Sequence, residues 1–377
     1  MHRIGTESRY LHPMPIWSPQ QDAALGAVKS WLNSSQPQVF RLFGYAGTGK
    51  TTLARHIAEN VDGEVCFAAF TGKAALVLRS KGCVGAQTIH SLIYRSRGVD
   101  EESPTFTLNR ESNAAKADLI IIDECSMVDE DLGRDLLSFG TRVLVLGDPA
   151  QLPPVKGGGY FTEHMPDIML TEVHRQAADN PIIRMSMTIR EGGRLSVGDY
   201  GESRVIRRDA ITPEIVLGSD QVLVGMNKTR RLYNARIRDL MGRTSLMPVA
   251  GEKLVCLRND KSKGLLNGGA WIVQELKASK KGLITMRVTP EDDANGKAVK
   301  VSVLPEFFDG REEETPWDIR KHTDEFTYGY ALTVHKAQGS QWNDIVLFDE
   351  AFAFREHRDR WLYTGLTRAA ERVTVVM

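Results

Sequence analysis

The sequence has few of the features that mark secreted, zinc-binding or membrane proteins. Its 377 residues contain four cysteines, and none of them has C-x-x-C spacing. This arrangement predicts reduced interior thiols rather than a disulfide framework or a zinc site. No stretch approaches the ~18 apolar residues of a membrane span, and the start lacks the apolar core of a signal peptide. We therefore expect a cytoplasmic protein that makes no contact with a membrane.

The chain also lacks net charge, since 48 Lys and Arg balance 48 Asp and Glu. No overall basic field points to nucleic acid, so any nucleic-acid binding must come from local grooves. A composition that is 42% hydrophobic and 25% charged is typical of a folded protein, and the length predicts two or three domains.

Short apolar runs alternate with helical patterns in the first half, which is the rhythm of βαβ units on a parallel sheet. These runs lie at 38–43, 64–70, 118–124 and 142–148. A second such rhythm begins at 221–227, resumes at 325–339 and closes at 372–377. Between its parts, residues 251 to about 320 read as short strands separated by Gly, Asn and Lys turns, which indicates a small β-barrel inserted in a second α/β unit.

A polar stretch at about 91–117 interrupts the first α/β unit and predicts a small β-hairpin insert. Phe106 is the only aromatic residue between 99 and 117 and has β-prone neighbours. We expect it at or near the hairpin tip, where it either meets an opening base pair or anchors the hairpin to its own domain.

A nucleotide-binding loop lies between the first strand and the helix that follows it. Residues 44–51 read GYAGTGKT and fit the pattern G-x-x-x-x-G-K-[ST], whose backbone N–H groups cradle phosphates. Lys50 would neutralise phosphate charge and Thr51 would bind Mg²⁺. The alternative is a glycine-rich loop without a ligand. The loop residues assigned to the nucleotide are Gly44, Gly47, Thr48, Gly49, Lys50, Thr51 and Thr52.

Polar residues at the ends of later strands fit the chemistry of ATP hydrolysis. Asp123 and Glu124 end an apolar strand, where the first would bind magnesium and the second would polarise the attacking water. Gln151 follows the next strand and could contact the γ-phosphate. Arg175 and Arg368 could stabilise transition-state charge. Taken singly, these residues also fit a strand-end turn, a proline-stiffened loop and surface charges.

The ordered set of motifs resembles superfamily 1 helicases of the RecD and Dda branch, with UvrD-like motifs at the C-terminal end. Members of this branch move 5′ to 3′ on single-stranded DNA. The motifs are WSPQQDAAL (17–25), the phosphate loop, FTGKAA (70–75), TIHSL (88–92), DECSM (123–127), GDPAQLPPV (147–155), LTEVHRQ (170–176), YALTVHKAQGSQW (330–342) and YTGLTRA (363–369).

The resemblance implies an α/β fold of two RecA-like P-loop NTPase lobes, each a parallel sheet with helices on both faces, with ATP between them. Lobe 1A would span 1–170 with a hairpin pin, 1B, at about 91–117. Lobe 2A would span 171–377 with an SH3-like barrel, 2B, at about 251–320.

The resemblance also assigns roles to individual residues. Gln21 would read adenine, Gly339 and Gln341 would lie near the ribose, and Arg175 and Arg368 would reach the nucleotide from the far lobe. The DNA track would contain small polar and basic groups suited to a phosphate backbone, with Phe106 at the fork. These residues are Thr71, Lys73, Thr88, His90, Phe106, Thr333, His335 and Lys336.

The function that the resemblance implies is an ATP-dependent DNA helicase of bacterial or phage origin, with ATP and Mg²⁺ as cofactors. It would act as a monomer on single-stranded DNA and fork junctions in replication, repair or recombination, with replication or repair proteins as further partners. An RNA helicase or a non-unwinding, nucleic-acid-stimulated ATPase is the alternative within the superfamily. A P-loop kinase or GTPase switch would explain the phosphate loop but not the second α/β half, and an architectural DNA-binding module would need no γ-phosphate contacts.

Overall fold

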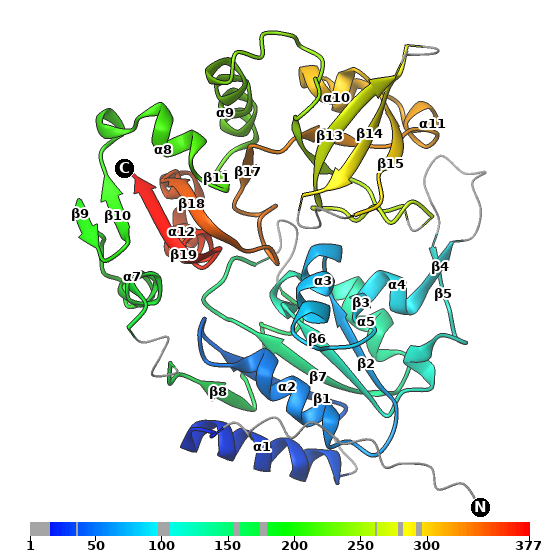
Figure 1. Cartoon of the computed structure of the whole chain (residues 1–377). Helices are drawn as coiled ribbons and strands as arrows, with labels where there is room; N and C mark the ends of the chain where they lie inside the picture. The colour runs from blue at the N-terminus through cyan, green and yellow to red at the C-terminus, as the bar shows by residue number, and fades with distance from the viewer. Residues whose placement is uncertain are drawn as a thin grey trace, which may run out of the picture.

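The computed structural model describes residues 16–34, 37–96, 106–153, 159–173, 179–260, 262–277, 282–291 and 296–377. Three main sheets organise these residues, with the first low in Figure 1, the second at upper left and the third at upper right. In the described parts of the chain, no helix is long and apolar enough to cross a membrane.

The first sheet has six strands in the order β3-β2-β6-β7-β1-β8, and all of its pairings are parallel. Its strands are β1 (Val39–Gly44), β2 (Val65–Ala69), β3 (Gln87–Thr88), β6 (Leu119–Asp123), β7 (Arg142–Gly147) and β8 (Ile168–Leu170). Its helices are α1 (Pro19–Leu32), α2 (Lys50–Glu59), α3 (Gly72–Ser80), α4 (Ile89–Ile93) and α5 (Glu130–Leu137).

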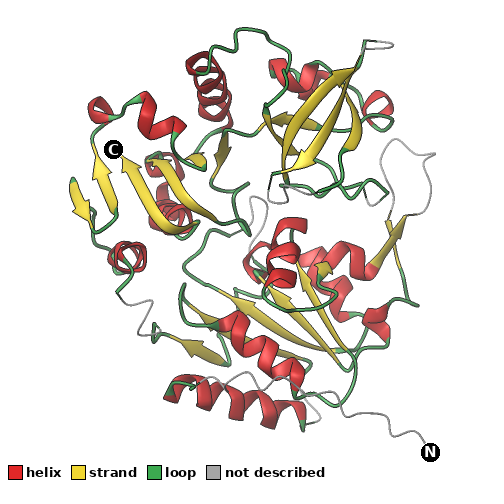
Figure 2. Cartoon of the chain, in the orientation of Figure 1, coloured by secondary structure: helices red, strands yellow, loops and turns green. Residues whose placement is uncertain are grey.

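Helices cover both faces of this first sheet, as Figure 2 shows. Successive strand residues point to opposite faces. Ile121 therefore joins a core with α1, α2 and α3, whereas Ile120 and Ile122 join a core with α4 and α5. Burial on both faces explains why β6 is a continuous apolar run rather than an alternating one.

The second sheet has the order β17-β11-β18-β19-β10-β9, in which only β9 is antiparallel. Its strands are β9 (Gly198–Tyr200), β10 (Ser203–Ile206), β11 (Gln221–Val224), β17 (Ala331–Thr333), β18 (Trp342–Phe348) and β19 (Ala369–Val376), and its helices are α7 (Pro181–Arg190), α8 (Pro213–Leu217), α9 (Asn227–Leu240) and α12 (Arg358–Leu366). Helices α7 and α12 pack on one face and α9 on the other. The two parallel sheets confirm the predicted α/β class.

A third, antiparallel sheet has the order β15-β14-β13-β12-β16. Its elements are β12 (Lys253–Cys256), β13 (Ala270–Lys277), β14 (Ile284–Pro290), β15 (Val299–Val303), β16 (Phe326–Tyr328) and the short helices α10 (Glu306–Asp309) and α11 (Trp317–Arg320). A bridge between Val303 and Asp324 brings β15 against the chain before β16. The sheet thereby closes into a small barrel, which continues to Tyr328, beyond the predicted end near 320. Its likeness to an SH3 barrel stays a prediction.

A two-stranded antiparallel sheet, β4 (Tyr94–Ser96) with β5 (Phe106–Leu108), occupies the predicted hairpin insert. Phe106 begins β5 opposite Ser96, so it lies on a strand. The residues between the two strands, 97–105, lie outside the described part of the chain.

Candidate functional site: the nucleotide cleft and the adjoining groove

The phosphate loop connects β1 to α2 and is shaped by its glycines. Gly47 and Gly49 have φ of 79° and 82°, a conformation that glycine adopts most readily. A Cβ on Gly44 would lie 2.6 Å from Thr48 Oγ1 and 2.8 Å from Leu170 Cβ, so this close approach also requires glycine. No side chain caps α2, which leaves the N–H groups of its first turn facing the loop, as anion binding requires.

The sheet brings together Thr51 and Asp123, the two residues predicted to bind magnesium. The Thr51 hydroxyl donates to Asp123 Oδ2 at 3.0 Å although the two residues are 72 positions apart. The Lys50 ammonium donates to the carbonyls of Gly44 and Tyr45 at 2.7 and 3.0 Å. Hydroxyl and carboxylate oxygens beside a phosphate loop suit Mg²⁺.

Glu124 has an unusual backbone, with φ of 54° and ψ of 46°. A non-glycine residue in the left-handed region is strained, and such strain is concentrated at functional sites. Burial raises the pKa of the Glu124 carboxyl, and the Arg368 guanidinium acts in the opposite direction. The Arg368 guanidinium, which directly precedes β19, therefore partly offsets the effect of burial on this carboxyl.

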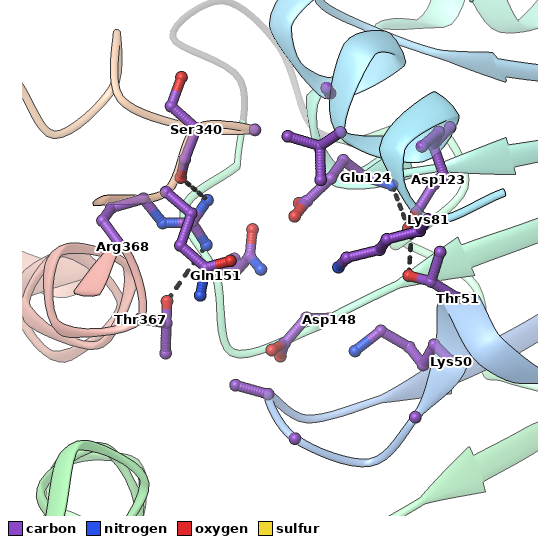
Figure 3. Close-up of a pocket in the computed structure, with 18 of the residues that line it drawn as sticks. Lys50, Thr51, Lys81, Asp123, Glu124, Asp148, Gln151, Ser340, Thr367 and Arg368 are labelled. Carbon is purple, nitrogen blue, oxygen red and sulfur yellow. Dashed lines mark hydrogen bonds between the residues drawn. The ribbon is translucent and has the colours of Figure 1, made fainter. Parts of the chain in front are cut away.

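A cleft of about 420 Å³ collects these groups together with residues from the second sheet. Figure 3 shows Arg368, Ser340 and Thr367 on one side, and Lys50, Thr51, Asp123 and Glu124 on the other, with Asp148 and Gln151 between them. Eleven of the residues predicted from the sequence to form the nucleotide site line this cleft. They are Gly47, Gly49, Lys50, Thr51, Thr52, Asp123, Glu124, Gln151, Gly339, Gln341 and Arg368.

The Gln151 side chain is buried, and its Oε1 has no hydrogen-bond partner among the residues that the structure describes. Because an unpaired buried carbonyl oxygen is costly, this amide is suited to a ligand in the cleft.

Gln21 lies beside the phosphate loop. It is buried, forms a capping box with Ser18 at the start of α1, and donates from Nε2 to the Thr48 carbonyl at 3.1 Å. Its neighbour Gln20 accepts the N–H groups of Thr171 and Glu172 at 2.9 and 3.0 Å. Arg175 lies outside the described residues.

The three threonines assigned to the DNA track act as local capping groups. Thr71 begins α3 and accepts the Ala74 N–H at 3.1 Å, and Thr88 begins α4 and accepts the Ser91 N–H at 3.0 Å. Thr333 accepts the Lys336 N–H at 3.3 Å. These bonds fix the chain turns at the ends of β2, β3 and β17. Lys73 lies in the first turn of α3, beside Thr71.

A groove of about 850 Å³ adjoins the nucleotide cleft at Leu152 and contains Thr333, His335 and Lys336. The His335 ring lies 5.3 Å from that of Phe354, centroid to centroid. Desolvation by the walls of the groove lowers the pKa of Lys336 to about 8, with Arg230 acting in the same direction, while part of the side chain stays exposed to solvent. Thr88, His90 and Phe106 lie apart from this groove, around α4 and the hairpin.

Phe106 and His90 belong to an aromatic cluster at the base of the hairpin. The Phe106 ring is 54% exposed and lies 6.2 Å from the rings of both His90 and Tyr94. The His90 and Tyr94 rings are 5.1 Å apart. Phe106 is therefore packed on one side and exposed on the other, so both of its predicted roles remain open.

Sequence reasoning missed several polar residues at the cleft. Asp148 and Lys81 line it, and Tyr363 bonds to Asp148 from α12. Asp148 ends an apolar strand as Asp123 does, so the same signal could have revealed it. Tyr363 lies in the motif YTGLTRA, which marks the segment but not the role of this side chain, and no local pattern indicates Lys81.

Comparisons with known proteins agree with this architecture. Residues 17–209, just over half of the chain, match the AAA domain family, and residues 328–376 match the UvrD-like helicase C-terminal domain.

Two curated relatives are helicases by name. The chain is 31% identical over 367 residues to the ATP-dependent RecD2 DNA helicase of Deinococcus radiodurans, a match that covers 88% of this chain and 46% of that protein. It therefore spans about half the length of RecD2. It is 27% identical over 382 residues to the ATP-dependent DNA helicase Pif1 of Bdellovibrio bacteriovorus, covering 87% and 81%.

Among solved structures, Pif1 helicase from Bacteroides in complex with ADP-AlF3 and ssDNA shares the fold. The TM-score is 0.55 at 19% identity, with 93% of this chain and 91% of that chain covered. The chain therefore belongs to the AAA domain family, within the RecD- and Pif1-like branch of superfamily 1 helicases.

Proposed function

We propose that this protein is an ATP-dependent DNA helicase that couples Mg-ATP hydrolysis to 5′-to-3′ movement on single-stranded DNA and to strand separation. The observation that carries this proposal is the meeting of Lys50 and Glu124 with Arg368 in one cleft between two sheets. Because the site needs groups from both lobes, it is complete only when the cleft between the lobes closes. ATP hydrolysis is therefore linked to movement of one lobe relative to the other. The names of RecD2 and Pif1 support the same activity.

The residues of the cleft divide the chemistry among them. Lys50 and the loop N–H groups bind the phosphates, and the Thr51 and Asp123 oxygens would hold Mg²⁺. When bound, this ion neutralises charge on the β- and γ-phosphates. Glu124 takes the proton of the attacking water, and Arg368 stabilises the charge that spreads over the γ-phosphate oxygens.

The remaining assignments belong to the same proposal. Gln21 reads adenine, Gly339 and Gln341 lie by the ribose, Gln151 senses the γ-phosphate, and Arg175 supplies a second positive charge. The chain divides at about 170 into lobes 1A and 2A, with inserts at about 91–117 and 251–320. It works as a monomer, with replication or repair proteins as partners.

Single-stranded DNA would pass through the groove of about 850 Å³, where Lys336 contacts the phosphate backbone. Thr71, Lys73, Thr88, His90, Thr333 and His335 complete the predicted track. Phe106 is the candidate surface at the fork because its exposed face could replace lost base stacking, worth about 1–3 kcal/mol per base.

Unwinding of forked DNA tests the proposal. With ATP, the wild-type protein should unwind a fork with a 5′ single-stranded tail and leave a 3′-tailed fork intact, and Lys50→Ala should unwind neither. DNA-stimulated hydrolysis without unwinding would indicate a non-unwinding ATPase. Stronger stimulation by RNA would indicate an RNA helicase, and hydrolysis that no nucleic acid stimulates would refute the proposal.

A further inference from the structure

Tyr363 lies in α12, five residues before Arg368, and is 1% exposed. Its hydroxyl accepts the Ala46 N–H of the phosphate loop at 3.0 Å and donates to Asp148 Oδ2 at 2.7 Å. One oxygen atom therefore connects the phosphate loop, the end of β7 and the helix that leads to Arg368.

Neighbouring contacts join the same two parts of the molecule. The Thr364 hydroxyl accepts the Leu152 N–H at 2.9 Å, and Gln338 Nε2 donates to the Leu152 carbonyl at 3.0 Å. The Arg190 guanidinium lies 3.7 Å from the centre of the Tyr45 ring. Helices α7 and α12 and the loop after β17, which all flank the second sheet, thus contact both the phosphate loop and the loop after β7.

Asp148 depends on this junction for its hydrogen bonds. It is 2% exposed, its Oδ1 accepts the Ala150 N–H at 3.0 Å, and its Oδ2 accepts the Tyr363 hydroxyl. Burial raises the pKa of Asp148, while Lys50 and the Tyr363 hydroxyl lower it. Burial and the Asp148 carboxylate also raise the pKa of Tyr363, so the phenol keeps the proton that it donates. A buried carboxylate needs such donors, and this one comes from the second sheet.

We propose that Tyr363 is a positioning residue whose hydroxyl sets α12, the helix that leads to Arg368, against the phosphate loop and so links closure of the two lobes to hydrolysis. This inference rests on the proposed ATPase function. The hydroxyl touches no reacting atom and acts through Arg368, whose guanidinium must be positioned to a fraction of an ångström for its hydrogen bonds to stabilise the γ-phosphate. Small misplacements of such a group cost rate rather than substrate affinity.

Tyr363→Phe tests this role because it removes one oxygen and keeps the packed ring. Tyr328→Phe is a matched control, since Tyr328 is also buried and its hydroxyl donates to the Leu246 carbonyl at 2.8 Å, outside the cleft. Tyr363→Phe loses two buried hydrogen bonds, to Ala46 and Asp148, and Tyr328→Phe loses one. DNA-stimulated kcat should fall about tenfold in Tyr363→Phe, with KM for ATP and single-stranded DNA affinity within about twofold of wild type. Tyr328→Phe should lower Tm through its lost hydrogen bond but keep its kcat.

Two further measurements separate this role from general stabilisation. Hydrogen exchange of the Ala46 amide should accelerate in Tyr363→Phe and not in Tyr328→Phe. Asp148→Asn should reduce kcat less in the Tyr363→Phe background than in wild type, because both changes act on one hydrogen bond.

Three results would overturn the inference: a Tyr363→Phe kcat within about twofold of wild type, an equal fall in Tyr328→Phe, or unchanged exchange at Ala46. Wild-type protein that hydrolyses ATP no faster than Lys50→Ala would instead refute the proposed function, and the exchange measurement would still test the hydroxyl link.

Discussion

Arg368→Ala should slow ATP hydrolysis far more than it weakens ATP binding. The guanidinium is 5% exposed and is held by three bonds, from Nε to the Thr364 carbonyl at 3.1 Å, from Nη1 to the Ser340 carbonyl at 3.2 Å and from Nη2 to Thr367 Oγ1 at 3.2 Å. Arginine has five N–H groups, so each terminal nitrogen keeps one that has no partner within the described chain.

The expected size of the effect follows from those two remaining N–H groups. Each can make one charge-assisted bond to a γ-phosphate oxygen, worth about 1.5–3 kcal/mol. Two such bonds contribute about 3–6 kcal/mol, which corresponds to a fall in kcat of about 10²–10⁴-fold at 1.4 kcal/mol per factor of ten. This range overlaps the effect of arginine fingers in other phosphoryl-transfer enzymes, about 10³–10⁵-fold.

The assay is steady-state hydrolysis at saturating ATP and single-stranded DNA, with Arg368→Lys as the matched variant. Lysine keeps the charge but not the fork of donors, so its kcat should lie between those of wild type and Arg368→Ala. KM for ATP should change little because Lys50 and Thr51 remain, and Tm shows whether each variant is folded at the assay temperature. A folded Arg368→Ala with kcat within about fivefold of wild type, or with only its DNA affinity reduced, would refute the reasoning.

Four other substitutions test separate parts of the site. Lys50→Ala should abolish turnover through loss of phosphate binding, whereas Glu124→Gln should still bind ATP, measured by equilibrium binding, but hydrolyse it orders of magnitude more slowly; turnover like wild type in either would contradict the assignment. With a pKa of about 8, Lys336 is charged below that pH and neutral above it, so affinity for single-stranded DNA should fall as pH rises from about 7 to 9. Lys336→Arg should remove that dependence, and an identical pH profile would exclude the contact. Phe106→Ala should keep DNA-stimulated hydrolysis but unwind a 5′-tailed fork several-fold more slowly; loss of both activities together with a lower Tm would make Phe106 a packing residue.

The sequence alone was sufficient for features that depend on local chemistry. The glycine spacing of 44–49 dictates the phosphate loop because the backbone there requires positive φ and close approach. The apolar runs that became β1, β2, β6, β7 and β11 were predicted correctly because strands buried on both faces leave a continuous apolar signal. The short β8 was not predicted, since three residues carry too little pattern to distinguish a strand from a loop.

Contacts between distant segments were decided only by the tertiary structure. The closing of the barrel at Asp324 and the packing of Phe106 against Tyr94 depend on how neighbouring strands are placed. The Tyr363 hydroxyl meets Ala46 across 317 residues and Asp148 across 215, and no periodicity or spacing records such a pair. A buried hydrogen bond between two lobes exists because the folded chain brings a donor and an acceptor to one point and excludes water from it, and only the three-dimensional arrangement of the sheets determines that point.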